Sequence, residues 1–67
     1  MKLPVTLAAT RQTVVIDVEL AVYNRARSGT EHSRNIIIDL TRKQLPDDVT
    51  IDLTWESMVV GEPGRVP

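Results

Sequence analysis

The stretch Thr13-Val14-Val15-Ile16-Asp17-Val18-Glu19-Leu20-Ala21-Val22-Tyr23 decides the fold that this sequence predicts. Aliphatic residues recur at every second position, and neighbouring side chains of a strand point to opposite faces. β-Branched residues, which restrict a helix, are frequent in the same stretch. The pattern therefore predicts one long strand over residues 13–23. Its inward face would carry Val14, Ile16, Val18, Leu20 and Val22.

An aspartate between two aliphatic residues, as in Ile16-Asp17-Val18, returns as Ile38-Asp39-Leu40 and as Ile51-Asp52-Leu53. In an extended chain each copy has one apolar side and one charged side. Leucine and valine also alternate with other residues near the start of the chain. The sequence thus predicts three further strands, over residues 3–9, 35–41 and 49–60, with a long polar loop over residues 24–34.

Charge repulsion selects the pairing of these strands, because like charges opposite each other are unfavourable. Antiparallel pairing in chain order places Leu7 opposite Ile16 and Asp39 opposite Thr50, and no two carboxylates then face each other. Pro4 lacks the N–H that a central strand donates, so the first strand is expected at a sheet edge. The result is a self-consistent antiparallel meander.

One apolar face of this sheet would have no cover, because no segment shows the apolar period of an amphipathic helix. Burying each large aliphatic side chain gains about 1.5–3 kcal/mol, and monomers rarely expose large apolar patches. The 67-residue chain has no cysteine and hence no disulfide to stabilise it. We therefore predict an all-β fold, a small antiparallel meander of about four strands packed as a sandwich or barrel-like homo-oligomer, either a homodimer or a higher oligomer. The predicted oligomer interface comprises Ile16, Val18, Leu20, Ile38, Leu40, Ile51, Leu53 and Trp55.

Residues 1–60 are predicted to form a single β domain, and residues 61–67 a flexible C-terminal tail rich in glycine and proline. No apolar run reaches the length that crosses a membrane. Pro4 and Thr6 interrupt the apolar start of the chain, which differs in this way from a signal peptide. We expect a cytoplasmic protein without membrane contact.

Acidic side chains dominate the second face of the predicted strands. Such a surface attracts basic partners, so we predict a non-enzymatic interaction protein, a small inhibitor or accessory protein that acts as an oligomer. The same pattern is typical of a solvated strand face that prevents sheets from pairing at their edges, and a site for a hard cation is a weaker alternative. The candidate partner-binding residues are Asp17, Glu19, Asp39, Asp52 and Glu56.

Basic residues gather in the predicted loop 24–34. Arginine side chains bind phosphates, and a β-ribbon can enter a groove of nucleic acid. Nucleic-acid binding is therefore the alternative function, although no aromatic residue is interleaved with the arginines for base stacking. A plain surface hairpin is the simpler interpretation. The candidate residues are Arg25, Arg27, Arg34 and His32.

Catalysis has little support in this sequence. No serine lies in a strand–turn–helix elbow, the three glycines form no phosphate-binding loop, and His32 is the single histidine. We expect no enzymatic activity, no cofactor and no metal. Trp55 is assigned to the core or the interface, with ligand stacking as the alternative, and Tyr23 to a cross-strand pair or a partner contact.

Overall fold

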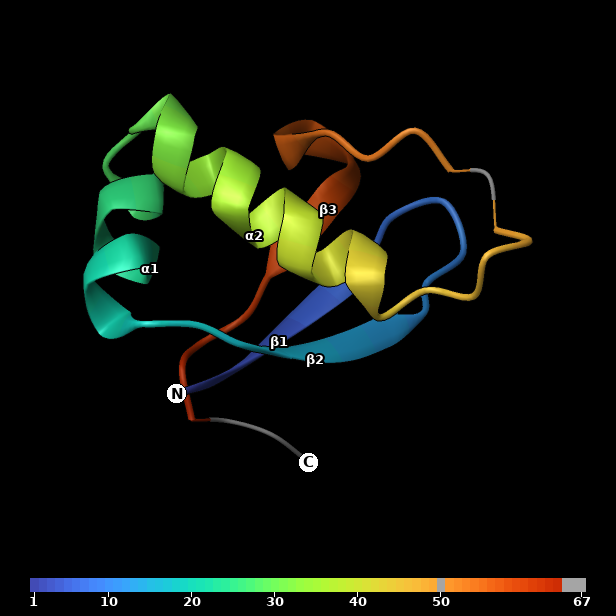
Figure 1. Cartoon of the computed structure of the whole chain (residues 1–67), viewed down its shortest axis with the longest axis horizontal. Helices are drawn as coiled ribbons and strands as arrows, with labels where there is room; N and C mark the ends of the chain where they lie inside the picture. Colours follow the sequence, from blue (N-terminus) through green and yellow to red (C-terminus); the bar gives the residue numbers. More distant parts are fainter. Residues whose placement is uncertain (50, 65–67) are drawn as a thin grey trace.

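The computed structural model describes residues 1–49 and 51–64, and within them two helices lie on one face of a three-stranded antiparallel sheet (Figure 1). Thr50, in the predicted fourth strand, and residues 65–67 of the predicted tail lie outside this range. In chain order the elements are β1 (Lys2–Leu7), β2 (Thr13–Asp17), α1 (Leu20–Arg27), α2 (Glu31–Lys43), the short 3₁₀ helix η1 (Trp55–Ser57) and β3 (Met58–Val60).

The sheet has the strand order β2-β1-β3, so β1 is its central strand. Leu3 pairs with Ile16, and the predicted pairing of Leu7 with Ile16 is wrong. The reason is the tight turn after β1, which closes with a hydrogen bond of 2.8 Å from the Leu7 N–H to the Gln12 carbonyl. Arg11 completes this turn in the left-handed region, with a φ of 59°.

Pro4 therefore lies in the central strand, and the predicted edge position is wrong. Its side without an N–H faces β3, which ends at Val60, directly opposite Val5. Beyond that point Gly61 donates its N–H to the Pro4 carbonyl at 2.8 Å, and the Gly64 N–H donates to the Lys2 carbonyl at 2.9 Å. Because β3 ends at Val60, no residue of β3 lies opposite Pro4 and needs a hydrogen bond from the N–H that proline lacks. Proline is therefore tolerated in the central strand.

Helix α1 replaces residues 20–23 at the end of the predicted strand 13–23 and residues 24–27 at the start of the predicted loop 24–34. The alternation of buried residues continues only to Val18, after which the buried positions are Tyr23 and Ala26, three residues apart. This spacing places both side chains on one face of a helix. Gly29, with a φ of 102°, lies in the turn between α1 and α2.

Helix α2 replaces the predicted strand 35–41 and the end of the predicted loop 24–34. Its buried positions are Ser33, Ile37 and Thr41, which recur every four residues. Two of the three are polar, and the Thr41 hydroxyl donates a hydrogen bond of 2.8 Å to the Ile37 carbonyl. A hydropathy pattern does not treat serine and threonine as buried positions, so it does not detect this helical stripe. The alternation of Ile36, Ile38 and Leu40 predicted a strand instead.

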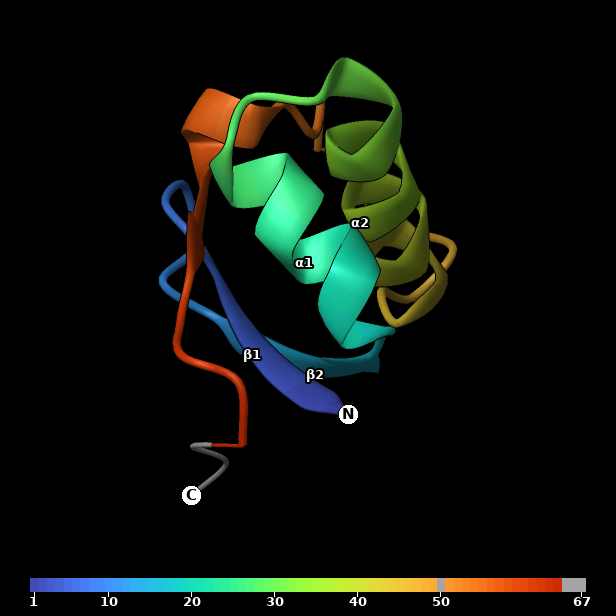
Figure 2. The same ribbon diagram turned by 90° about the vertical axis from the view of Figure 1, so that its left-hand side faces the viewer.

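The core lies between the sheet and the helices, so the all-β prediction is wrong. Buried side chains of β1 and β2 share one core with Tyr23 and Ala26 of α1 and Ile37 of α2. The two helices lie over the face of the sheet that was expected to pack against a second copy (Figure 2). This cover removes the physical reason for a sandwich, a barrel or a homodimer built on that face. Of the predicted interface residues, Ile16, Val18 and Leu53 are buried in this core; Ile38, Leu40, Ile51 and Trp55 pack partly buried against it; Leu20 is 55% exposed.

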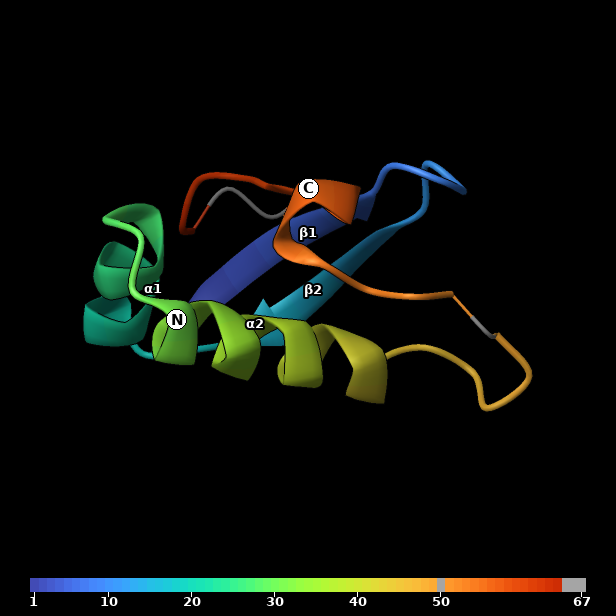
Figure 3. The ribbon, with the colours of Figure 1, turned by 90° about the horizontal axis from the view of Figure 1, so that it is seen from above.

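Viewed from above, β2 runs at an oblique angle to α2, and α2 meets α1 at one end of the sheet (Figure 3). The chain then returns past α2 to η1 and β3. This return brings η1 close to the turn between the helices and so builds the site described below. Among residues 1–49 and 51–64, neither helix combines the length and the hydropathy needed to cross a bilayer.

Candidate functional site

The five predicted acidic residues do not share one strand face. Asp17 ends β2, Glu19 precedes α1, Asp39 lies on α2, Asp52 lies in the return segment and Glu56 lies in η1. All five are exposed. The sheet therefore does not array them side by side, and a common acidic surface built by the strands is not observed.

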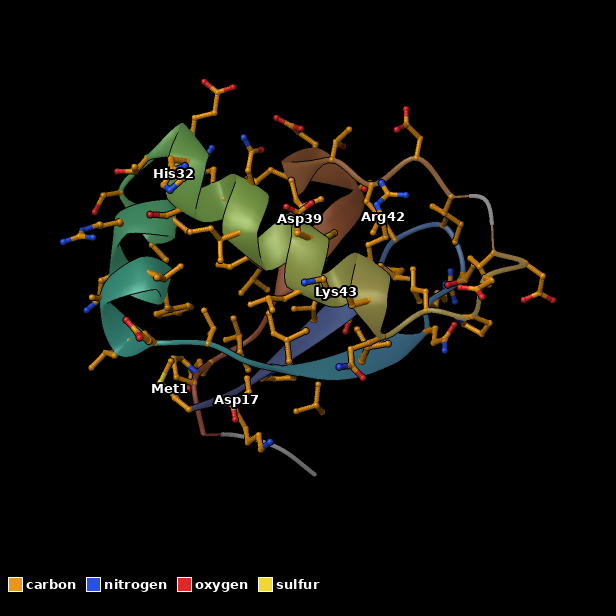
Figure 4. All side chains as sticks on the ribbon, in the orientation of Figure 1. Met1, Asp17, His32, Asp39, Arg42 and Lys43 are labelled. Atoms are coloured by element: carbon orange, nitrogen blue, oxygen red, sulfur yellow. The ribbon has the colours of Figure 1, made fainter. Side chains whose placement is uncertain are left out.

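Asp17 is engaged at the start of the chain. Met1 and Asp17 lie side by side (Figure 4), and the Met1 ammonium donates a hydrogen bond of 2.8 Å to Asp17 Oδ1. Lys2 Nζ lies 3.5 Å from Asp17 Oδ2. The hydrogen bond and charge of the ammonium, with a smaller contribution from Lys2, hold the pKa of Asp17 below its ordinary value of 3.8. This carboxylate ties the end of β2 to the start of β1.

The predicted basic loop is folded into the end of α1, a turn and the start of α2. Arg25 and Arg27 belong to α1, and His32 and Arg34 to α2. The guanidinium of Arg27 lies 5.7 Å from the centre of the Tyr23 ring, and its Nη1 is 3.5 Å from the Tyr23 hydroxyl. Arg27 thus extends over an aromatic ring one helical turn away.

Arg34 joins three elements. Its Nε–H donates a hydrogen bond of 2.8 Å to the carbonyl of Ala26 near the end of α1. Its guanidinium lies over the ring of Trp55, with 4.8 Å between the guanidinium carbon and the ring centre. A half-buried arginine of α2 is therefore held by the backbone of α1 on one side and by η1 on the other.

A capping box orients Trp55. The Ser57 N–H donates to Thr54 Oγ1 at 3.2 Å, and the Thr54 N–H donates to Ser57 Oγ at 2.9 Å. These reciprocal bonds close one turn of 3₁₀ helix and satisfy backbone donors that would otherwise be free. The half-buried indole is consequently supported by local backbone structure as well as by Arg34.

Two hollows flank Trp55 in the described part of the chain. The first has a volume of about 470 Å³ and the second about 440 Å³, and both open to solvent. We define the Trp55 surface as the residues that line them. The first hollow is lined by Tyr23, Arg27, Trp55, Met58, Val59, Val60, Gly61 and Glu62, and the second by Gly29, Glu31, Arg34, Asn35, Ile38, Leu53, Thr54, Trp55 and Glu56.

The Trp55 surface combines apolar, aromatic and mixed charged groups. Arg27 and Arg34 line it together with Glu31, Glu56 and Glu62. This arrangement can bury an apolar side chain and pair with charges of both signs. Within residues 1–49 and 51–64, no group of three or more histidine and acidic side chains is placed to hold a metal ion.

Of the sequence candidates, the structure brings together Arg27, Arg34, Trp55 and Glu56, and it leaves Arg25 and His32 outside the two hollows. Sequence reasoning missed that Tyr23 and Trp55 supply the aromatic partners of the arginines. The capping box between Thr54 and Ser57 is seen in the structure, and the predicted strand over residues 49–60 did not include this turn at the tryptophan. Comparison with protein-family models, with curated proteins and with solved structures finds no match to this chain, so the chemistry of the Trp55 surface is the guide to its function.

Proposed function

We propose that this chain is a non-enzymatic binding module that recognises another protein through the Trp55 surface. The observation that carries the proposal is the position of Trp55 between two open hollows, with an arginine lining each. Tryptophan, tyrosine and arginine are the residues that most often dominate the energy of protein interfaces. Here they come together from α1, α2 and η1.

The charges of the Trp55 surface favour a protein partner over nucleic acid. Polyanion binding depends on basic groups that replace condensed counterions. The two hollows hold two arginines against three glutamates, Glu31, Glu56 and Glu62, and the whole chain has a formal net charge of −1. A protein surface with an apolar centre and both signs of charge fits this lining better.

Nucleic-acid binding remains the second candidate because Arg27 and Arg34 lie on aromatic rings. Aromatic side chains beside arginines are also the chemistry of single-strand binding. The proposal that the acidic residues dock a basic partner now has less support, since those residues lie in separate elements. In this part of the molecule Glu31 and Glu56 supply acidic groups beside Arg34.

A peptide-display experiment tests the protein proposal. A phage-displayed library of random peptides is selected on the whole chain, and the enriched peptides are measured against three variants. Asn35→Trp fills the second hollow and Val59→Arg obstructs the first, both from exposed positions that line them, while Gln44→Trp is the control at an exposed position outside both. We expect one of the two blocking variants to abolish binding and Gln44→Trp to preserve it.

Equal binding to all of these variants would overturn the proposal. The nucleic-acid candidate is measured separately, by fluorescence anisotropy with labelled oligothymidine over a salt series. A steep salt dependence that Arg27→Gln and Arg34→Gln both reduce would replace the protein partner by single-stranded nucleic acid.

A further inference from the structure

The guanidinium of Arg34 is held in place before any partner arrives. Its Nε–H is used by the Ala26 carbonyl at 2.8 Å, and its plane is supported by the Trp55 ring at 4.8 Å. The hydrogen bond uses the Nε–H, and the Trp55 ring covers one face of the guanidinium, so the terminal Nη groups are not used by either contact. A planar fork that is already oriented loses less side-chain entropy when it forms further hydrogen bonds.

The outer N–H groups of Arg34 have no partner among the residues that the structure describes. The ion pairs found there both involve Asp17, and the one hydrogen bond found for the side chain of Arg34 is the bond from Nε. Glu31 and Glu56 line the same hollow without forming an ion pair with Arg34. A carboxylate accepts two parallel N–H bonds from such a guanidinium edge.

An apolar floor lies beside this edge. Ile38 and Trp55 are half-buried and Leu53 is almost fully buried, and all three line the second hollow with Arg34. A volume of about 440 Å³ is large enough for one apolar side chain of a partner. The hollow therefore offers adjacent places for an apolar group and for an acidic group.

We propose that Arg34 recognises a single acidic side chain of the partner, placed next to an apolar side chain that enters the second hollow. This inference rests on the proposed function and specifies the partner chemistry of the same surface. Glu31 and Glu56 border the site and repel additional acidic groups, so the site selects one carboxylate rather than a run of them.

The test is a double-mutant cycle on the peptides whose binding requires the second hollow. Each acidic residue of such a peptide is replaced by its amide, Asp by Asn or Glu by Gln, and affinities are measured for the wild-type chain and for Arg34→Gln. We expect either change alone to weaken binding about ten- to a hundredfold. We expect the second change to cost little once the first is made, because the pair has already been broken.

Two controls separate this pairing from folding effects. Arg25→Gln removes the same charge from an exposed position outside both hollows and should leave the affinity unchanged. Arg34→Lys keeps the charge but loses the planar fork, and it should lose most of the affinity. The double-mutant cycle measures an interaction energy between the peptide carboxylate and residue 34. A purely structural role of Arg34 would not produce such an interaction energy.

The outcomes distinguish the two proposals. Three results overturn the carboxylate assignment and leave the binding module in place. They are a library whose peptides all depend on the first hollow alone, peptides that need the second hollow but lack an acidic residue, and an additive cycle at Arg34. Enrichment of peptides with runs of acidic residues would also contradict it. A library in which no peptide depends on either hollow overturns the proposed function, and the assignment to Arg34 falls with it.

Discussion

Gly61 donates its backbone N–H to the carbonyl of Pro4 at 2.8 Å, and a Cβ at Gly61 would lie 2.8 Å from Pro4 Cγ. The chain after β3 thus lies directly against the proline ring of the central strand. Glycine is required here by the close approach, since no other residue type fits beside the ring without a shift.

Gly61→Ala should therefore destabilise the fold by about 1–3 kcal/mol, as expected for a side chain forced into a packed position. Urea denaturation followed by circular dichroism measures the free energy of unfolding. Val59→Ala, at a position 62% exposed on β3, is the control and should change stability by less than about 0.5 kcal/mol. Equal effects of the two substitutions would contradict the close contact.

Ile37 distinguishes the observed helix from a strand. Its side chain is fully buried while that of Ile36 is only partly buried, whereas a strand over residues 35–41 with Ile38 and Leu40 inward would bury Ile36 and expose Ile37. Ile37→Val should cost about 0.5–1.5 kcal/mol, because one buried methylene is removed. Ile36→Val in the same helix should cost less, again measured by urea denaturation. A larger loss at Ile36 would favour the strand.

Asp17 makes stability depend on pH in the acidic range. Its pKa in the folded chain lies below the ordinary value of 3.8, so the unfolded chain binds more protons than the folded chain. The contribution of Asp17 is present above the unfolded pKa and is lost as the pH falls through the folded pKa. In Asp17→Asn, the urea midpoint should decrease less than in the wild type as the pH falls from the unfolded pKa of Asp17 to its folded pKa.

Glu19→Gln is the control for Asp17, because Glu19 is exposed and follows β2 without an ion pair among the described residues. It should leave the pH dependence intact. The Asp17 effect should also shrink in high salt, since this carboxylate is exposed and its ion pairs are screened. An unchanged pH profile of Asp17→Asn would refute the assignment.

Thr54 should control the environment of the single tryptophan. Thr54→Ala removes a capping hydrogen bond from η1 and should cost about 0.5–2 kcal/mol. The emission maximum of Trp55 should move to longer wavelength as the indole becomes more hydrated. Thr30→Ala is a matched control, because Thr30 occupies the N-cap of α2 without a side-chain capping bond. A shift of equal size in both variants would argue against the capping box.

Local patterns were sufficient for the hairpin at the start of the chain. Leu3, Val5 and Leu7 alternate with Pro4 and Thr6, and the structure confirms a strand there, paired antiparallel with β2. The inward positions Val14, Ile16 and Val18 are also buried as predicted. These features follow from the two-residue period, which is a property of neighbouring residues.

The helices were missed because a period of two was extended beyond Val18. Over residues 20–27 a helix buries only Tyr23 and Ala26, and over residues 31–43 the buried stripe contains Ser33 and Thr41. In both segments the choice between strand and helix depends on which side chains become buried against the sheet. Burial against β1 and β2 decides it, and that contact is non-local.

The sequence by itself determined the two strands of the β1–β2 hairpin and their antiparallel order, because these depend on residues a few positions apart. It predicted a strand over residues 49–60, where the structure has the capped turn η1 at Trp55 and only the short strand β3. Only the tertiary structure decided that α1 and α2 cover the sheet and that Arg34 lies on Trp55. These contacts join segments that are distant along the chain, and their formation depends on how the layers pack. Spacing along the sequence carries no information about such packing.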